Sequence, residues 1–211
     1  MLITAANQTK TTRIAIHVDG EFHFTVDPFS WAESGLAVGS EIDETILHQL
    51  LANSHLSQAK KLALRLLSLR AYSVRDLYRR IVALYPKEIA EAIVDEMLDL
   101  GYLNDLEYAD RWTAELYHSK GYGIRRIRQE LTAKGIGPDL IEEVTEWIDR
   151  QEEPHRACTV IQKKIGPIAN DKTRRRAAAL LERYGYSTAS IHMALHLEAC
   201  NDNDETTEEL L

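Results

Sequence analysis

Residues 121 to 135 read GYGIRRIRQELTAKG, and they contain the most specific pattern in the chain. It begins with a Tyr-Gly pair followed by two aliphatic residues one helical turn apart, a pattern written Y-[SG]-x3-[LI]-x3-[LI]. The pattern starts at Tyr72, Tyr122 and Tyr186, so successive copies are separated by 50 and 64 residues. Ser caps a helix, Gly allows a sharp entry, and the aliphatic pair anchors the new helix to its neighbour. The three matches predict three copies of one helical unit, each with its tyrosine packed at the corner.

Helical periodicity from residue 57 onward supports this division. In the first unit, Ser57 and Ser73 are the expected N-caps of two helices, and a third helix ends at Gly101. The predicted units are repeat 1 at 57–104, repeat 2 at 105–153 and repeat 3 at 154–201. The expected core-facing residues of repeat 1 are Leu62, Leu66, Leu69, Val74, Leu77, Ile81, Leu84, Ile89, Ile93, Met97 and Leu100.

The other two repeats follow the same plan. The expected helices of repeat 2 are 105–119, 123–134 and 138–149, and those of repeat 3 are 155–165, 172–184 and 187–199. Tandem units of this kind stack into an elongated, curved array in which each copy touches mainly its neighbours. The fold class is therefore expected to be mainly α, with tandem three-helix repeats.

The N-terminal region, residues 1–56, has a different period. Residues 13–26 read RIAIHVDGEFHFTV and alternate as two strands around Asp19-Gly20, which predicts a β-hairpin. A two-residue loop would split the apolar side chains between the two faces, so a three-residue loop or a bulge at Gly20 is favoured. The favoured register pairs Val18 with Phe22, Ile16 with Phe24 and Ile14 with Val26. A turn at 28–33 and an amphipathic segment at 43–52 are expected to cover this face.

Composition restricts the class of protein. The chain has 211 residues, 45% of them hydrophobic, which is enough to form a core. Its two cysteines, Cys158 and Cys200, lack any C-x-x-C spacing, which predicts a reducing compartment and no disulfide scaffold. The chain contains no run of eighteen apolar residues and its start does not resemble a secretory signal, so a cytoplasmic protein without a membrane partner is expected.

No constellation of catalytic residues is evident. The pairs Gly121/Gly123 and Gly135/Gly137 lie between helices without the Lys of a phosphate-binding loop, so turns explain them. His192 and His196 are four residues apart on a predicted helix but lack a third ligand type beside them. We therefore expect no enzyme activity, no cofactor and no metal.

The basic residues are more informative than the formal net charge of −8. Repeat 3 carries a net charge of +5, and the tail at 202–211, expected to be disordered, carries −5. Basic clusters recur on equivalent helices, where they could form a stripe that contacts a partner or nucleic acid; a merely solvated face is the simpler alternative. The candidate binding residues are Arg75, Arg79, Arg80, Arg125, Arg126, Arg128, Lys163, Lys164, Lys172, Arg174, Arg175 and Arg176.

These motifs resemble the RecX family, regulators of the RecA recombinase. The resemblance rests on the repeats, on LDLGYLND at 98–105, on LERYGYSTASI at 181–191 and above all on GYGIRRIRQELTAKG. It covers residues 57–199. It implies a non-enzymatic protein that binds the RecA filament on DNA and inhibits its ATPase, strand exchange, and recombination and SOS activities. A monomer is expected. Whether the basic stripe also contacts single- or double-stranded DNA directly is left open.

Two other classes of protein remain as alternatives. The second and third helices of each repeat could form a helix-turn-helix module of a transcription regulator, which a sequence-specific shift on duplex DNA would reveal. The other alternative is an enzyme whose active site lies in the N-terminal region, although no pair of acid and base, no nucleophile and no set of metal ligands supports it.

Overall fold

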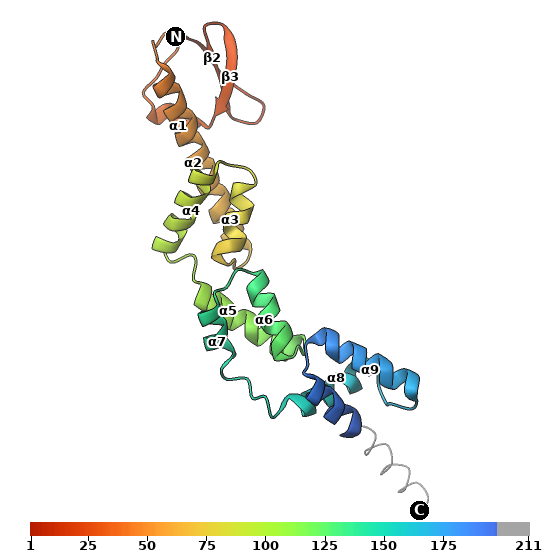
Figure 1. Cartoon of the computed structure of the whole chain (residues 1–211). Coiled ribbons are helices and arrows are strands. Elements are labelled where there is room, and N and C mark those ends of the chain that lie inside the picture. The colour runs from red at the N-terminus through yellow and green to blue at the C-terminus, as the bar shows by residue number, and fades with distance from the viewer. Residues whose placement is uncertain (198–211) are drawn as a thin grey trace, which may run out of the picture. The chain divides into compact units, whose positions relative to one another are not determined.

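The computed structural model describes residues 1–197, which fold as two compact units divided between Asn104 and Asp105. Both units are mostly helical, and the first also holds a small antiparallel sheet (Figure 1). The predicted mainly α class with a β-containing N-terminal region is confirmed. Cys200, the end of the last predicted helix and the acidic segment at 202–211 lie outside the described residues.

The sheet has three strands rather than the two of the predicted hairpin. Strands β1 (Ile3–Gln8), β2 (Ile14–Val18) and β3 (Glu21–Val26) lie in the order β1-β2-β3, and both pairings are antiparallel. The prediction missed β1 because its sequence, ITAANQ, has no apolar alternation. Only Ile3 of this strand is buried, so the strand is held mainly by its antiparallel backbone pairing with β2.

The hairpin register is partly as predicted. Ile14 faces Val26 and Ile16 faces Phe24, as expected, but the residue paired with Val18 is Glu21 rather than Phe22. The turn is therefore the two-residue Asp19-Gly20 loop, in which both φ angles are positive, 50° and 90°. A bulge at His23, on β3, restores the apolar face that a regular two-residue hairpin would have split.

Two helices cover the sheet, and the second is much longer than predicted. Helix α1 (Pro28–Glu33) is followed by α2 (Glu44–Leu69), one continuous helix of 26 residues that begins at the N-cap Asp43. Ser57 is thus not an N-cap, which corrects the prediction. Because residues 53–57 contain neither Gly nor Pro, nothing in the backbone ends the helix there.

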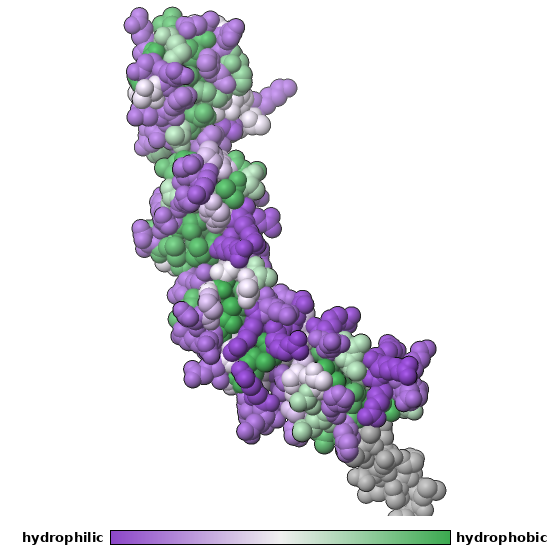
Figure 2. Space-filling model, in the orientation of Figure 1, coloured by the Kyte–Doolittle hydropathy of each residue, from purple (hydrophilic) through white to green (hydrophobic). Residues whose placement is uncertain are grey.

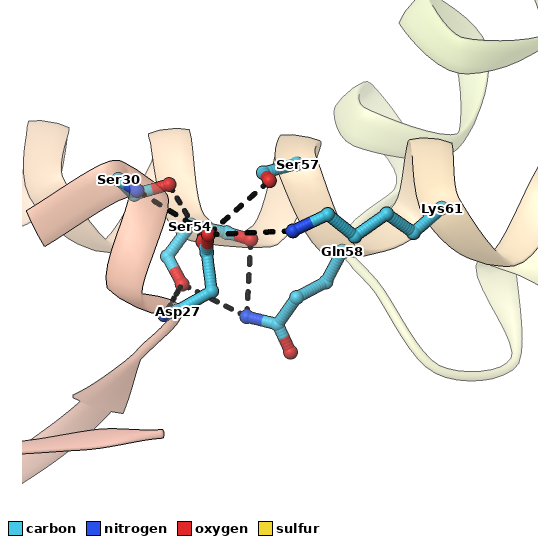
Figure 3. A network of polar contacts seen from close by, with 6 residues as sticks. All are labelled: Asp27, Ser30, Ser54, Ser57, Gln58 and Lys61. Atoms are coloured by element: carbon cyan, nitrogen blue, oxygen red, sulfur yellow. Dashed lines mark hydrogen bonds and ion pairs between the residues drawn. The ribbon is translucent and has the colours of Figure 1, made fainter. Parts of the chain in front are cut away.

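Instead, Ser57 belongs to a buried polar network that ties α1 to α2 (Figure 3). The Asp27 carboxylate accepts hydrogen bonds from the Ser30 hydroxyl at 2.6 Å, the Ser30 N–H at 3.2 Å and the Ser57 hydroxyl at 3.4 Å. The backbone N–H of Asp27 donates to Ser54 Oγ at 3.0 Å, and Lys61 Nζ lies 3.6 Å from Asp27 Oδ1. Burial opposes ionisation of Asp27, but the Ser30 hydrogen bonds and the Lys61 charge outweigh it and lower its pKa below the ordinary value.

Replacing Asp27 with Ala is expected to lower the free energy of unfolding of the N-terminal unit by about 1 to 3 kcal/mol, because buried donors lose their acceptor. The contribution is present above the ordinary carboxyl pKa of 3.8 and is lost as the pH falls through the lowered pKa of the folded state. Urea unfolding at pH 7 and at pH 3 measures both effects. Asp43→Ala is the matched control, since it removes an exposed N-cap that accepts one hydrogen bond, from Ile46 N–H. A smaller loss for Asp27→Ala than for Asp43→Ala would contradict the buried role of Asp27.

The first repeat is completed by α3 (Val74–Val82) and α4 (Lys87–Asp99). Ser73 caps α3 as predicted, since its side chain accepts the Asp76 N–H. Leu77, Ile81, Ile93 and Met97 are fully buried with Ala59 and Ala63 of α2. Three residues predicted to face this core are instead exposed, because they lie at or beyond the helix ends: Leu69 (73%), Leu84 (70%) and Leu100 (55%).

The second unit holds two further helical groups with separate buried clusters. The first contains α5 (Asp105–Ala114), the π-helix η1 (Glu115–Ser119), α6 (Ile124–Ala133) and α7 (Pro138–Thr145). The second contains α8 (Glu153–Lys164), α9 (Asp171–Tyr184) and a final helix described over residues 188–197. The aliphatic pair of the motif, Ile127 and Leu131, is fully buried on α6. The five-part domain division remains a prediction.

Candidate partner-binding surface

Two glycines bring the two groups of the C-terminal unit into backbone contact. Gly123 N–H, at the start of α6, donates to the Tyr184 carbonyl at 2.9 Å. A Cβ on Gly123 would lie 2.6 Å from the Gly185 carbonyl oxygen, and a Cβ on Gly185 would overlap the backbone of Arg126. The close approach therefore requires glycine at both positions. The GYG of the motif thus belongs to a joint between repeats.

Tyrosines fill the space around this joint. Tyr186 is fully buried, and its hydroxyl donates to the Gly121 carbonyl at 3.0 Å. Burial raises the pKa of Tyr186 to about 12, although the Arg156 charge opposes the shift. The predicted corner packing is confirmed for Tyr186 and for Tyr72, which is 7% exposed. Tyr122 is half-buried and packs edge-on against Tyr184, with ring centroids 5.1 Å apart.

Sequence reasoning did not single out two charged residues of α8, of which Arg156 contacts the preceding helical group and Glu153 the final helix. Arg156 donates to the Tyr117 carbonyl at 2.7 Å and stacks over the Tyr117 ring at 3.1 Å from its centroid. Burial lowers the pKa of its guanidinium, against the opposing effect of Tyr186, Tyr117 and Glu153. Glu153 is 9% exposed and accepts the Ser190 hydroxyl at 2.6 Å. Nothing local in the sequence distinguishes these two residues from solvent-facing charges.

The candidate arginines of the first repeat lie where they were expected. Arg75, Arg79 and Arg80 are exposed on α3. Arg75 and Arg79 lie on the side away from the buried Leu77 and Ile81, and Arg80 lies at the edge of that buried face. Their guanidinium groups are therefore accessible to a partner. Their role in binding remains a prediction.

The candidate arginines of the second repeat are not equivalent. Arg125 is exposed on α6. Arg126 forms an ion pair with Glu130 and lies over the Tyr122 ring, and Arg128 donates to Thr145 Oγ1 at 3.2 and 3.3 Å. The Arg126 guanidinium is thus already paired within α6, and the Arg128 guanidinium links α6 to α7.

The basic residues of the third repeat fall into two groups. Lys163 and Lys164, at the end of α8, line a cleft of about 250 Å³ with His118 and Lys120 of the preceding repeat. The remaining four are exposed on α9, and strongly hydrophilic side chains gather at the outer end of this helix in Figure 2, beside more apolar ones. These four are Lys172, Arg174, Arg175 and Arg176.

The described part of the chain offers little for catalysis. Within residues 1–197 no three His, Cys, Asp or Glu side chains lie together so as to hold a metal ion. None of the helices in that range combines the length and apolar character that crossing a bilayer requires. What the described surface does present is exposed basic side chains on α3 and α9 and two clefts lined partly by basic side chains. These features belong to a helical-repeat protein.

Comparison with known proteins names the family. A family model described as RecX, second three-helix domain, matches residues 104–144. Regulatory protein RecX of Mycobacterium avium is 33% identical over 135 residues, which cover 62% of this chain and 78% of that protein. Regulatory protein RecX of Bacillus velezensis is 27% identical over 213 residues, which cover 98% of this chain and 80% of that protein. The chain belongs to the RecX family of regulatory proteins.

Solved structures agree on the fold. A crystal structure of regulatory protein RecX superposes with a TM-score of 0.62 at 21% identity, covering 92% of this chain and 98% of the other. RecX from Lactobacillus salivarius gives a TM-score of 0.57 at 17% identity, covering 69% of this chain and 97% of the other. The helical architecture is therefore shared at low sequence identity.

Proposed function

We propose that this protein binds the RecA recombinase filament on DNA and restrains its ATPase and strand-exchange activities, without catalysing a reaction itself. The observation that carries the proposal is the match along 98% of the chain to a relative named as a RecX regulatory protein. Such a regulator needs exposed basic side chains on a folded framework, because its partner is a nucleoprotein with abundant phosphate and carboxylate groups.

The exposed basic residues fit this role. Arg75, Arg79 and Arg80 on α3, and Arg174 to Arg176 on α9, are exposed. Exposed arginines can form bidentate contacts with either phosphates or carboxylates. Arg126 and Arg128 are instead engaged by Glu130 and Thr145 of the chain itself, and we assign them to its stability.

A titration into a RecA ATPase assay on single-stranded DNA tests the proposal. ATP turnover is expected to fall at less than one copy of this protein per RecA subunit, and the protein alone is expected to hydrolyse no ATP. The triple variant Arg75→Ala, Arg79→Ala, Arg80→Ala should inhibit less while keeping its helical circular dichroism, because these side chains are exposed. Unchanged RecA turnover at equimolar addition of the folded protein would contradict the proposal. A sequence-specific shift of duplex DNA without any effect on RecA would favour the helix-turn-helix alternative.

A further inference from the structure

A second and larger cleft opens beside the contact of Gly123 with Gly185, which we call the glycine joint. The cleft lies between α6, the start of α8 and the final helix. It has a volume of about 680 Å³. Its apolar lining comes from Ile124, Pro154, Ala189 and Met193. Met193 is 56% exposed, a large apolar side chain left in contact with solvent. An exposed apolar lining of this kind is a typical feature of a site that receives a partner's side chain.

Arginines surround this lining. Arg125 and Arg150 are exposed, Arg128 is half-buried, and all three line the cleft. Within the described residues, neither Arg125 nor Arg150 has an acidic side chain at ion-pair distance. Their charges are therefore available to carboxylates of a partner, which arginine binds through two parallel hydrogen bonds.

Glu153 gives the same cleft a negative group at depth. Its Oε2 accepts the Ser190 hydroxyl at 2.6 Å and the Ser187 N–H at 3.4 Å, and its Oε1 is buried without a hydrogen-bond partner among the described residues. A phosphate entering the cleft would meet an apolar lining that cannot hydrogen-bond to it, whereas an apolar side chain can be buried there, with any flanking carboxylates held at the arginines and away from Glu153. The lysine-lined cleft at Lys120, Lys163 and Lys164 has no acidic lining residue and suits a phosphate better.

We infer that the cleft between α6, α8 and the final helix docks an acidic peptide segment that inserts one apolar side chain against Ile124 and Met193 and places flanking carboxylates on Arg125 and Arg150. The inference rests on the proposed function, because it assigns this segment to the surface of the recombinase. Burial of the segment's apolar side chain supplies most of the affinity, and the arginines favour segments with acidic residues on either side of it. Nucleic acid is the competing occupant that the test must separate.

Affinity for filaments on single-stranded DNA, measured with fluorescently labelled protein, provides the first arm. Arg150→Glu and Met193→Glu are each expected to weaken binding by about tenfold or more, because each places a carboxylate against an acidic segment. Arg183→Glu is the matched control: Arg183 is exposed on α9, outside the cleft lining, and its change carries the same charge reversal. The control should bind within about twofold of the parent, and all variants should keep their melting temperature, because the altered side chains are exposed.

Photo-crosslinking provides the second arm and identifies the occupant. A benzoylphenylalanine at position 193 is expected to attach to a recombinase peptide with net negative charge and an apolar residue beside the acidic ones. Attachment to DNA, to a basic segment or to this chain itself would overturn the inference, as would equal affinities of Arg150→Glu, Met193→Glu and Arg183→Glu.

If the parent inhibits the RecA ATPase while the cleft variants inhibit as well as the control, only the cleft assignment fails. If the parent neither binds nor inhibits, the proposed function fails and the cleft assignment falls with it.

Discussion

Replacing Leu131 with Ala is expected to lower the free energy of unfolding of the C-terminal unit by about 2 to 5 kcal/mol. Leu131 is fully buried on α6, in one cluster with Ile127, Leu116 and Val144. Truncation loses the burial of the side chain and leaves a cavity that a close-packed core cannot fill. Such a loss is a large share of the stability of a domain of this size.

Denaturant unfolding followed by circular dichroism measures this change. Leu106→Ala is the matched control, because Leu106 lies on α5 of the same group and is 41% exposed. We expect the control to remain within about 1 kcal/mol of the parent. Equal midpoints for Leu131→Ala and Leu106→Ala would show that the aliphatic pair of the motif does not anchor α6.

The second large effect is expected at the glycine joint. Gly185 has a φ of 83°, and Gly166 has a φ of 86° in the same unit. Alanine in this left-handed region costs about 1 to 2 kcal/mol at either position. At Gly185 the added methyl would also overlap the Arg126 backbone, whereas at Gly166 it would meet no atom within 4 Å. Gly185→Ala is therefore expected to cost about 1 to 3 kcal/mol more than Gly166→Ala.

Thermal melting of the two variants separates backbone strain from the contact between repeats. Limited proteolysis of Gly185→Ala should also show faster cleavage near Gly123, because that residue loses the fixed Tyr184 carbonyl to which it donates. Equal melting temperatures for the two variants would mean that the close approach at Gly123 and Gly185 contributes nothing to stability. Proteolysis confined to other sites would lead to the same conclusion.

The exposed basic surface was predictable because exposure of a helical residue follows from its phase. Arg75 and Arg79 lie opposite Leu77 by spacing alone, and Arg80 lies at the edge of the buried face. Contacts between a charged side chain and another segment do not follow from phase. The Arg126–Glu130 pair lies four residues apart on α6 and follows from spacing, whereas Arg128 resembled a surface charge and instead donates to Thr145 on α7. The partners of a long side chain depend on which other segments pack nearby.

The Ser73 cap, the buried pair Ile127 and Leu131 and the class of helical repeats could be predicted from the residue order, because each depends on a period of a few residues. Elements that depend on distant partners became visible only in the fold. Strand β1 has order because β2 pairs with it, and α2 runs unbroken past Ser57, whose hydroxyl is fixed by Asp27 thirty residues earlier. The cleft lined by Arg125, Arg150 and Met193 exists only where α6, α8 and the final helix meet, since its residues come from segments that local periodicity cannot bring together.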